Sequence, residues 1–254
     1  MTQSVEEFTR TIRSRLQDEV RREIEEGHGF FRKWYAGQLT RDQIGAFYQT
    51  IYFEACHAGR LLCRLLMLAP NRDAFNVIGQ NMGEELGAGR IENSHPELIL
   101  RLAGRYGRPI PRVLEEGPLA PLATLWAETG IKFAERSFAA GLASFTYIEA
   151  GVPSRHSQQR RALVEHYGAE RSQLEFHDQH LSLDAAEAAG GKNITDASVP
   201  GYGGDDVHVE RQVVHIATFA RSAEDQHLVL QAISAICDAK IKYYNQVNEL
   251  IAGA

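Results

Sequence analysis

The chain has 254 residues, of which 44% are hydrophobic, so it can bury a substantial core in one large domain or in two smaller ones. Its net charge is −6 and its 27 Lys and Arg residues are scattered, which argues against a nucleic-acid-binding surface. The sequence starts with polar and acidic residues and holds no apolar run of about 20 residues, so we expect neither a signal peptide nor a membrane span.

Three cysteines, Cys56, Cys63 and Cys237, lie among apolar residues and form no CxxC pair. Their odd number and their surroundings favour reduced, packed thiols over a disulfide framework or a thiolate metal site. Because reduced thiols are typical of the cytoplasm, we expect a cytoplasmic protein.

In chain order, the first half of the sequence shows the apolar spacing of amphipathic helices. Thr40, followed three residues later by Gln43, is typical of a helix start. Pro70 stops a helix, whereas Pro96 is suited to a first turn. The predicted segments are a helix over 5–26, an aromatic patch over 30–35, and helices over 41–68, 71–87 and 96–106.

The second half continues in the same way, with glycines and a proline at the helix ends. Helices are predicted over 119–150, 157–167, 172–189, 205–221 and 223–251, with a break between the first two at Gly151-Val152-Pro153. Residues 190–204 hold five glycines and are interpreted as an insertion. No β-hairpin signal, repeat or domain boundary is visible, so we predict a single all-α bundle of about seven or more helices over residues 1–254.

Candidate metal ligands gather in the helix predicted over 172–189. His180 and Asp184 are four residues apart and Glu187 is three further on, so all three share one face of the helix. An imidazole and two carboxylates in a row have the geometry of metal ligands inside a helical bundle, although an ordinary surface pair has the same spacing.

Other imidazoles and carboxylates lie near predicted helix ends. Glu84 and Glu85 precede His95, and His208 follows two aspartates at a helix start. Glu149 lies in an apolar stretch, where burial without a partner would cost several kcal/mol. Each of these residues is also compatible with simple surface exposure. Together, and without a thiolate cluster, they favour iron or manganese over structural zinc.

A second group of polar residues interrupts the helix over 41–68. Glu54 and His57 are three residues apart, and Arg60 follows on the same side, where its guanidinium could bind a substrate carboxylate through two hydrogen bonds. Together with Tyr52 these residues are the predicted substrate contacts. The alternatives are an additional metal ligand or a buried hydrogen bond for Glu54 and His57, and a structural ion pair for Arg60.

The order of these residues resembles that of a known family. The motifs Asn-x-x-Glu-Glu-x-Gly with a following His-x-x-Leu, then Tyr-x-Glu-x-x-Val-Pro, then Phe-x-x-x-His-x-x-x-Asp are similar to those of the haem-oxygenase-like diiron oxidases. That family is related in fold to pyrroloquinoline-quinone synthase and thiaminase II. The resemblance runs from about His28 to the C-terminus, and it implies a haem-oxygenase-like helical bundle.

Carried over residue by residue, the resemblance implies a metal site. Its ligands would be Glu84 or its neighbour Glu85, then His95, Glu149, His180 and Asp184. The family expects one more histidine three residues after Asp184, where this sequence has Glu187. Either Glu187 replaces that histidine, or an insertion has displaced the ligand to His208. Asp205 keeps the Asp-x-x-His spacing to His208 and could then substitute for Asp184.

The resemblance also implies two Fe(II) ions that react with O2, a small amine or amino-acid-derived substrate in specialised biosynthesis, and a homodimer, with an external reductant as an option. N-oxygenation and oxidative C–C cleavage are the implied reactions. The branch that forms p-aminobenzoate is disfavoured, because the positions of its Tyr and Lys hold Phe31 and Gln159 here. The alternatives are a metal-free, thiaminase-like hydrolase and a non-enzymatic helical interaction protein.

Overall fold

The computed structural model describes residues 2–108, 120–188 and 205–253. Every regular element in these ranges is a helix, which confirms the predicted all-α class. The long helices are α1 (Val5–Gly27), α3 (Arg41–Leu68), α7 (Ala120–Arg136), α8 (Phe138–Tyr167) and α11 (Ala223–Ala252). The shorter helices are α2 (Gly29–Tyr35), α4 (Arg72–Glu85), α5 (His95–Arg105), α9 (Glu175–Ala188) and α10 (Asp205–Phe219).

Local hydrogen bonds explain where the helices begin. At the start of α3 the Thr40 hydroxyl accepts a hydrogen bond from the Gln43 backbone, and the Gln43 side chain accepts one from the Thr40 backbone. The predicted capping motif at Thr40 is therefore confirmed, and the same motif starts α1 and α11. Each such cap stabilises its helix by about 1 kcal/mol.

Two helix boundaries predicted from the sequence are wrong. The segment 119–150 is two helices, because the chain turns at Ser137 between α7 and α8. The predicted break at Gly151-Val152-Pro153 is instead the interior of α8. Pro153 costs a helix interior about 3 kcal/mol, but α8 is buried along much of its length and its packing offsets this loss. Neither neighbour of Ser137 is Gly or Pro, so no sequence signal marks the turn.

Smaller differences concern helix ends. The aromatic patch over 30–35 forms α2, and the helix predicted from residue 172 begins at Glu175, after a 3₁₀ turn over Arg171–Gln173. The glycine-rich insertion predicted at about 190–204 lies outside the described residues. Among the described helices, none combines the length and the apolar character needed to cross a lipid bilayer.

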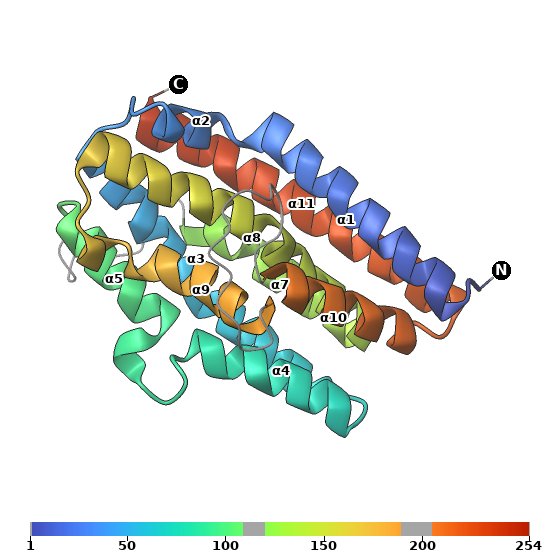
Figure 1. Ribbon diagram of the computed structural model, residues 1–254. Coiled ribbons are helices and arrows are strands. Elements are labelled where there is room, and N and C mark those ends of the chain that lie inside the picture. Colours follow the sequence, from blue (N-terminus) through green and yellow to red (C-terminus); the bar gives the residue numbers. More distant parts are fainter. Residues whose placement is uncertain (1, 109–119, 189–204, 254) are drawn as a thin grey trace.

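Two apolar clusters fill the bundle. The first, around Trp126, joins α1, α7 and α10 to parts of α3, α8 and α11. The second, around Trp34 and Phe47, joins α2, α5 and α9 to the remaining parts of α3, α8 and α11. Figure 1 shows α1 and α11 side by side along the bundle, with α8 beneath them. The helices α3, α8 and α11 therefore connect the two clusters.

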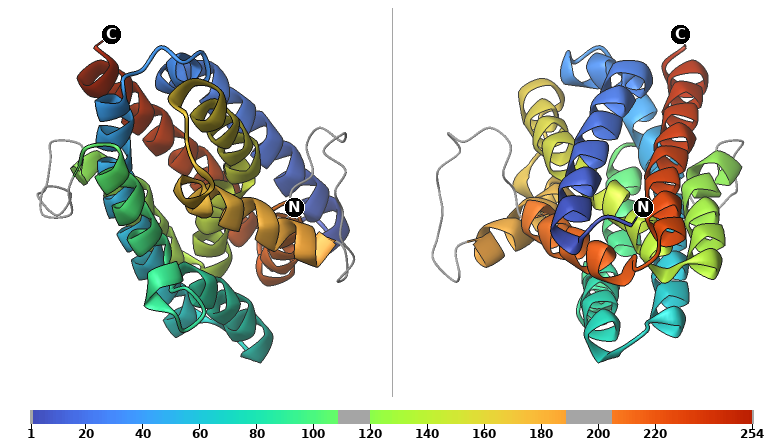
Figure 2. Two further views of the ribbon diagram at one scale, coloured as in Figure 1. Left: turned by 60° about the vertical axis from the view of Figure 1, so that its left-hand side comes forward. Right: turned by 90° about the vertical axis from the view of Figure 1, so that its right-hand side faces the viewer.

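The shorter helices bring the candidate ligands together. The helix α9 lies against α8, α10 and α5 (Figures 1 and 2), and α5 follows α4 after a short turn. The end of α4, the start of α5, the middle of α8 and the body of α9 therefore face a common region. Each of these four segments carries imidazoles or carboxylates that the sequence analysis singled out, or their close neighbours.

Candidate metal centre

Four histidine rings lie together where α5, α8 and α9 meet. The ring centre of His180 lies 4.1 Å from that of His156 and 4.3 Å from that of His95. His177, one turn before His180, lies 4.9 Å from His156. The predicted ligands His95 and His180 are therefore brought together, and two further imidazoles join them.

His95, His156 and His180 each use the Nδ1 atom in a hydrogen bond. His95 Nδ1 lies 2.9 Å from the Glu85 carboxylate, and His180 Nδ1 donates to the Phe176 carbonyl at 2.7 Å. His156 Nδ1 lies 3.1 Å from His177 Nδ1. This pattern leaves Nε2 of each ring as the nitrogen that can bind a metal, an arrangement common among metal-bound histidines.

The fourth ring, His177, acts as a link. Its Nε2 atom lies 2.8 Å from the hydroxyl of Tyr48, a fully buried residue of α3. Tyr48, His177 and His156 thus form one hydrogen-bonded line that crosses from α3 through α9 to α8. The line fixes the orientation of the His156 ring.

Burial controls the charge of these rings. It lowers the pKa of His156 and of His180 well below the ordinary histidine value, and neighbouring imidazoles lower both further. Burial, with a small effect of Arg160, lowers the pKa of His177 to about 3. These three rings are therefore neutral at pH 7, and a neutral imidazole is the form that binds a metal.

His95 is the exception. Burial is the largest single effect and lowers its pKa, but the charge and hydrogen bond of Glu85 together with the charges of Glu149 and Glu84 raise it by more, so the pKa of His95 is raised overall. The predicted ligands Glu84, Glu85 and Glu149 are thus all close enough to raise the pKa of this imidazole. Of the two alternatives at the end of α4, Glu85 is the one that bonds His95, while Glu84 accepts from Gln80 at 3.4 Å.

Four further predicted ligands lie on helices whose backbone is described but whose side chains lie outside the described part. Asp184 and Glu187 are in α9, and Asp205 and His208 are in α10. The choice between Glu187 and His208, and the role of Asp205, stay predictions. Among the side chains that the structure does describe, no three His, Cys, Asp or Glu groups already surround a common point as metal ligands would.

The described donor set nevertheless fits a metal ion. His95 Nε2 is buried and has no hydrogen-bond partner within the described ranges, although such an atom normally has one. Three imidazoles whose Nδ1 atoms are held by hydrogen bonds, with carboxylates beside them, are a ligand set that suits iron. The residues present are therefore compatible with an iron centre.

The sequence analysis missed His156 and His177. His156 lies seven residues after Glu149, a spacing that puts both on one face of a helix. The predicted break at Gly151-Val152-Pro153 assigned the two residues to different helices, so their position on one face was not predicted. The same seven-residue spacing separates His180 from Glu187. A prediction of one continuous helix through residues 149–156 would therefore have placed Glu149 and His156 on a shared face.

The predicted substrate contacts on α3 do not form one group. Glu54 is buried and forms an ion pair with Lys240 of α11, not with His57. His57 Nε2 accepts a hydrogen bond of 2.8 Å from Arg60 on the exposed side of the helix. The alternative of a buried Glu54–His57 hydrogen bond is therefore wrong. The role of Glu54, His57, Arg60 and Tyr52 in substrate binding stays a prediction.

The cysteines follow the sequence prediction in part. Burial raises the pKa of Cys237 to about 12 and also raises the pKa of Cys56, so both are protonated at pH 7. The prediction that all three are packed is wrong for Cys63, which is exposed because it lies four residues before the exposed Met67 on α3.

Comparison with known proteins shows the family of the chain. The sequence profile of a family described as iron-containing redox enzymes matches residues 46–240, about three quarters of the chain. The chain therefore belongs to the iron-containing redox enzymes, a family with the all-α, haem-oxygenase-like fold. A redox function follows at this general level. A search of curated proteins found no significant sequence match to the chain.

Proposed function

We propose that the protein is an O2-dependent, non-haem diiron oxidase or oxygenase that acts on a small amine or amino-acid-derived substrate. The observation that carries the proposal is the buried Nε2 atom of His95, which has no hydrogen-bond partner among the described residues, while Glu85 holds the other ring nitrogen. A metal ion is the natural partner of an imidazole nitrogen held in this way.

In this proposal the iron is held by both imidazoles and carboxylates. The Nε2 atoms of His95, His156 and His180 supply the nitrogens, and Glu149 with Glu85 or Glu84 supplies oxygens. Two ions need further ligands, which are proposed to be the carboxylates of Asp184 of α9 and of Glu187 or Asp205, or the imidazole of His208. These residues lie on α9 and α10, which pack against each other.

Iron bound at this site would supply the electrons that reduce O2. The protein supplies orientation and a dry environment. Glu85, the Phe176 carbonyl and His177 each bond one Nδ1 atom, which holds the rings in place. Because burial keeps His156 and His180 neutral, no proton has to leave these rings when a metal binds.

The substrate is proposed to approach along α3. Tyr52, His57 and Arg60 lie on this helix outside the fully buried core, and Arg60 keeps donors for a substrate carboxylate after bonding His57. Glu54 is proposed to take part through its partner Lys240. A homodimer and an optional external reductant belong to the same proposal and rest on the family resemblance. The proposed cytoplasmic location rests on the reduced cysteines.

Oxygen uptake tests the proposal. We expect Fe(II)-loaded protein to consume O2 faster when one member of a panel of amino acids and small amines is added, with a product changed by oxygenation or C–C cleavage. The variant His95→Gln should lose this uptake, whereas the exposed-site variant His227→Gln should keep it. Substrate-independent uptake that is equal in both variants would show that free iron is responsible and would contradict the proposal.

A further inference from the structure

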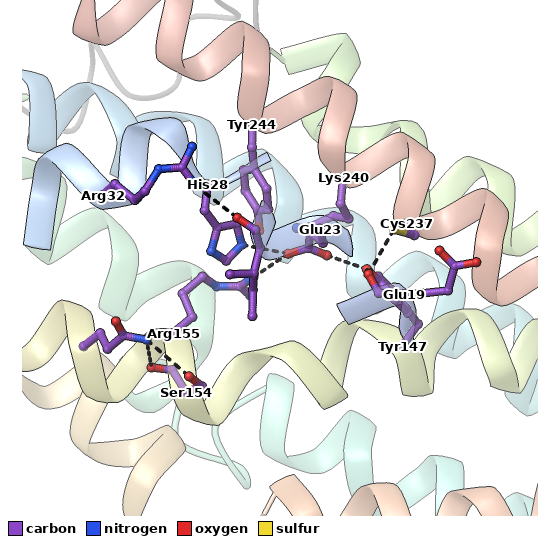
Figure 3. Close-up of polar contacts among 12 residues, drawn as sticks. Glu19, Glu23, His28, Arg32, Tyr147, Ser154, Arg155, Cys237, Lys240 and Tyr244 are labelled. Atoms are coloured by element: carbon purple, nitrogen blue, oxygen red, sulfur yellow. Dashed lines mark hydrogen bonds and ion pairs between the residues drawn. The ribbon is translucent and has the colours of Figure 1, made fainter. Parts of the chain in front are cut away.

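A second polar cavity lies on the other side of α8. It has a volume of about 150 Å³ and is enclosed by the end of α1, by α2 and by residues 150–158 of α8. Figure 3 shows the charged side chains of its wall, with Arg155 reaching from α8 toward Glu23 and His28. Its polar lining residues are Glu23, His28, Arg32, Tyr35, Ser154, Arg155 and Gln158.

The cavity is separate from the candidate metal centre. Gly151, Ser154, Arg155 and Gln158 are spaced along one face of α8, whereas Glu149 and His156 fall on the opposite face, given 3.6 residues per turn. The walls from α1 and α2 also precede residue 46, where the family match begins. The site is therefore formed partly by a segment outside the matched region.

The carboxylate in the wall is already satisfied. Glu23 is 4% exposed, and it accepts a hydrogen bond from Tyr147 at 2.7 Å and one from His28 at 3.1 Å. Arg155 lies 3.6 Å from the same carboxylate. With these partners Glu23 has little capacity to attract a cationic ligand.

The remaining groups of the wall are mostly hydrogen-bond donors. Arg155 is 7% exposed, and within the described residues its guanidinium donates one hydrogen bond, to Tyr244 at 2.9 Å, of the five it can make. The hydroxyl of Tyr35 is buried and has no partner in the described ranges. Arg32, at the rim, uses one donor for the Ile24 carbonyl at 3.1 Å.

The charges around the cavity favour an anion. The negative charges of the buried carboxylates Glu23 and Glu54 are balanced by the positive charges of Arg155 and Lys240. Arg32 therefore adds one positive charge that is not balanced within this group. Val20, Ile24 and Ala150 supply apolar wall beside these donors. A guanidinium with spare donors, facing an apolar wall, is suited to a carboxylate with a short carbon chain.

We propose that this cavity is a binding site for a small aliphatic monocarboxylate, with the carboxylate between Arg155 and Arg32 and the chain against Val20 and Ile24. A cavity of this size can hold a molecule of about six non-hydrogen atoms, since benzene fills a cavity of about 150 Å³. The site is independent of the iron and would let a small acid stabilise the contact of α1 and α2 with α8.

Calorimetric titration of the full-length protein tests the chemistry of the ligand. We expect binding of acetate, propionate and butyrate, with affinity rising along this series and falling for octanoate, which exceeds the cavity. Propionamide and propylamine, which match propionate in size, should not bind. Tighter binding of propylamine than of propionate would overturn the proposal, and so would binding that is equal for butyrate and octanoate.

Substitutions test the location. A Cβ atom at Gly151 would have no neighbour closer than 3.8 Å, so Gly151→Leu should fold and fill the cavity. We expect it to abolish propionate binding, and Arg32→Gln to weaken binding about two- to fivefold. The control Gly79→Leu, at another open helix position, should bind propionate normally. Unchanged binding in Gly151→Leu would contradict the site.

Iron content separates this proposal from the proposed function. Because the cavity lies on the face of α8 opposite Glu149 and His156, the propionate affinity should be the same before and after removal of iron by a chelator. A chain that binds no iron but still binds propionate would contradict the diiron proposal and support this one. Propionate binding seen only in the iron-loaded protein would indicate a carboxylate on the metal and would overturn the cavity proposal.

Discussion

At the scale of single residues, the site depends on which ring nitrogen of each histidine forms a hydrogen bond within the protein. His95, His156 and His180 all bond through Nδ1, to a carboxylate, an imidazole and a backbone carbonyl respectively. At His95 the other nitrogen, Nε2, is buried and has no hydrogen-bond partner among the described residues, whereas a satisfied structural histidine uses both of its nitrogens. The sequence predicted His95 and His180, but the role of His156 depends on the register of α8.

Substitution of His156 tests whether it belongs to the candidate metal centre. His156→Gln should lower the iron content of the purified protein by at least about half, because loss of a ligand or of its orienting partner typically costs 10–100-fold in metal affinity. The measurement is iron per chain after loading and gel filtration. The matched variant His227→Gln changes an exposed histidine of α11 and should leave the iron content as it is. Equal iron in both variants would remove His156 from the site.

The low pKa of His177 predicts a pH dependence of stability in the iron-free protein. Its pKa is about 3 in the folded chain, below the unfolded value of about 6.5, so between these values the unfolded chain binds more protons. The free energy of unfolding therefore falls as the pH drops below about 6.5, by about 1.4 kcal/mol per pH unit for this residue. The free energy of unfolding, measured with urea at pH 6.0 and 5.0, should fall less between these two pH values in His177→Gln than in the unsubstituted chain.

At the scale of the helices, α8 determines the arrangement of the site. It carries Glu149 and His156 on one face and the cavity residues Gly151 and Arg155 on the other. Its connection to α7 is close, because a Cβ atom at Gly141 would lie 2.4 Å from the Cβ atom of Ala134. The absence of a side chain at Gly141 is therefore what allows the two helices to pack against each other.

Two helical glycines provide a matched test of this contact. Gly141→Ala should lower the free energy of unfolding by about 1–3 kcal/mol, because the added methyl group overpacks the α7–α8 contact. Gly59→Ala, at a position in α3 with nothing within 4 Å, should raise it by about 0.5–1 kcal/mol through helix propensity. Chemical denaturation measures both changes. A stabilising effect of Gly141→Ala would contradict the described packing of α7 and α8.

Most helices could be predicted from the sequence, since apolar spacing and capping residues such as Thr40 are local signals. The boundary between α7 and α8 could not, because the turn at Ser137 depends on the close approach at Gly141 and because Pro153 suggested a stop. The same error hid the alignment of Glu149 with His156. Local signals thus predicted which helices exist, whereas tertiary packing decided where two of them end.

At the scale of the whole molecule, buried ion pairs join helices that are far apart in the sequence. Lys240 of α11 pairs with Glu54 of α3, and Arg155 of α8 lies 3.6 Å from Glu23 of α1. Their partners are separated by more than a hundred residues, so spacing within one helix gives no sign of them. The sequence of α3 alone therefore predicted Glu54 as a substrate contact and gave no sign of its partner Lys240.

The Glu54–Lys240 pair predicts a non-additive effect of mutation. Lys240→Met should lower the free energy of unfolding by about 3–5 kcal/mol, because it leaves the Glu54 carboxylate buried without its partner. The double variant Glu54→Gln, Lys240→Met should recover much of this loss, since no unpaired charge remains. If urea unfolding gives additive losses in the double variant, the two side chains do not form the described pair.

The central claim is that the histidine cluster holds iron, and anaerobic titration of Fe(II) into the iron-free, full-length protein tests it most directly. The account predicts two irons per chain and a transient visible absorption band when O2 is then added. It also predicts that His180→Gln, which removes the ring between His95 and His156, binds less iron. No bound iron, or the same iron stoichiometry in His180→Gln as in the unsubstituted chain, would contradict it.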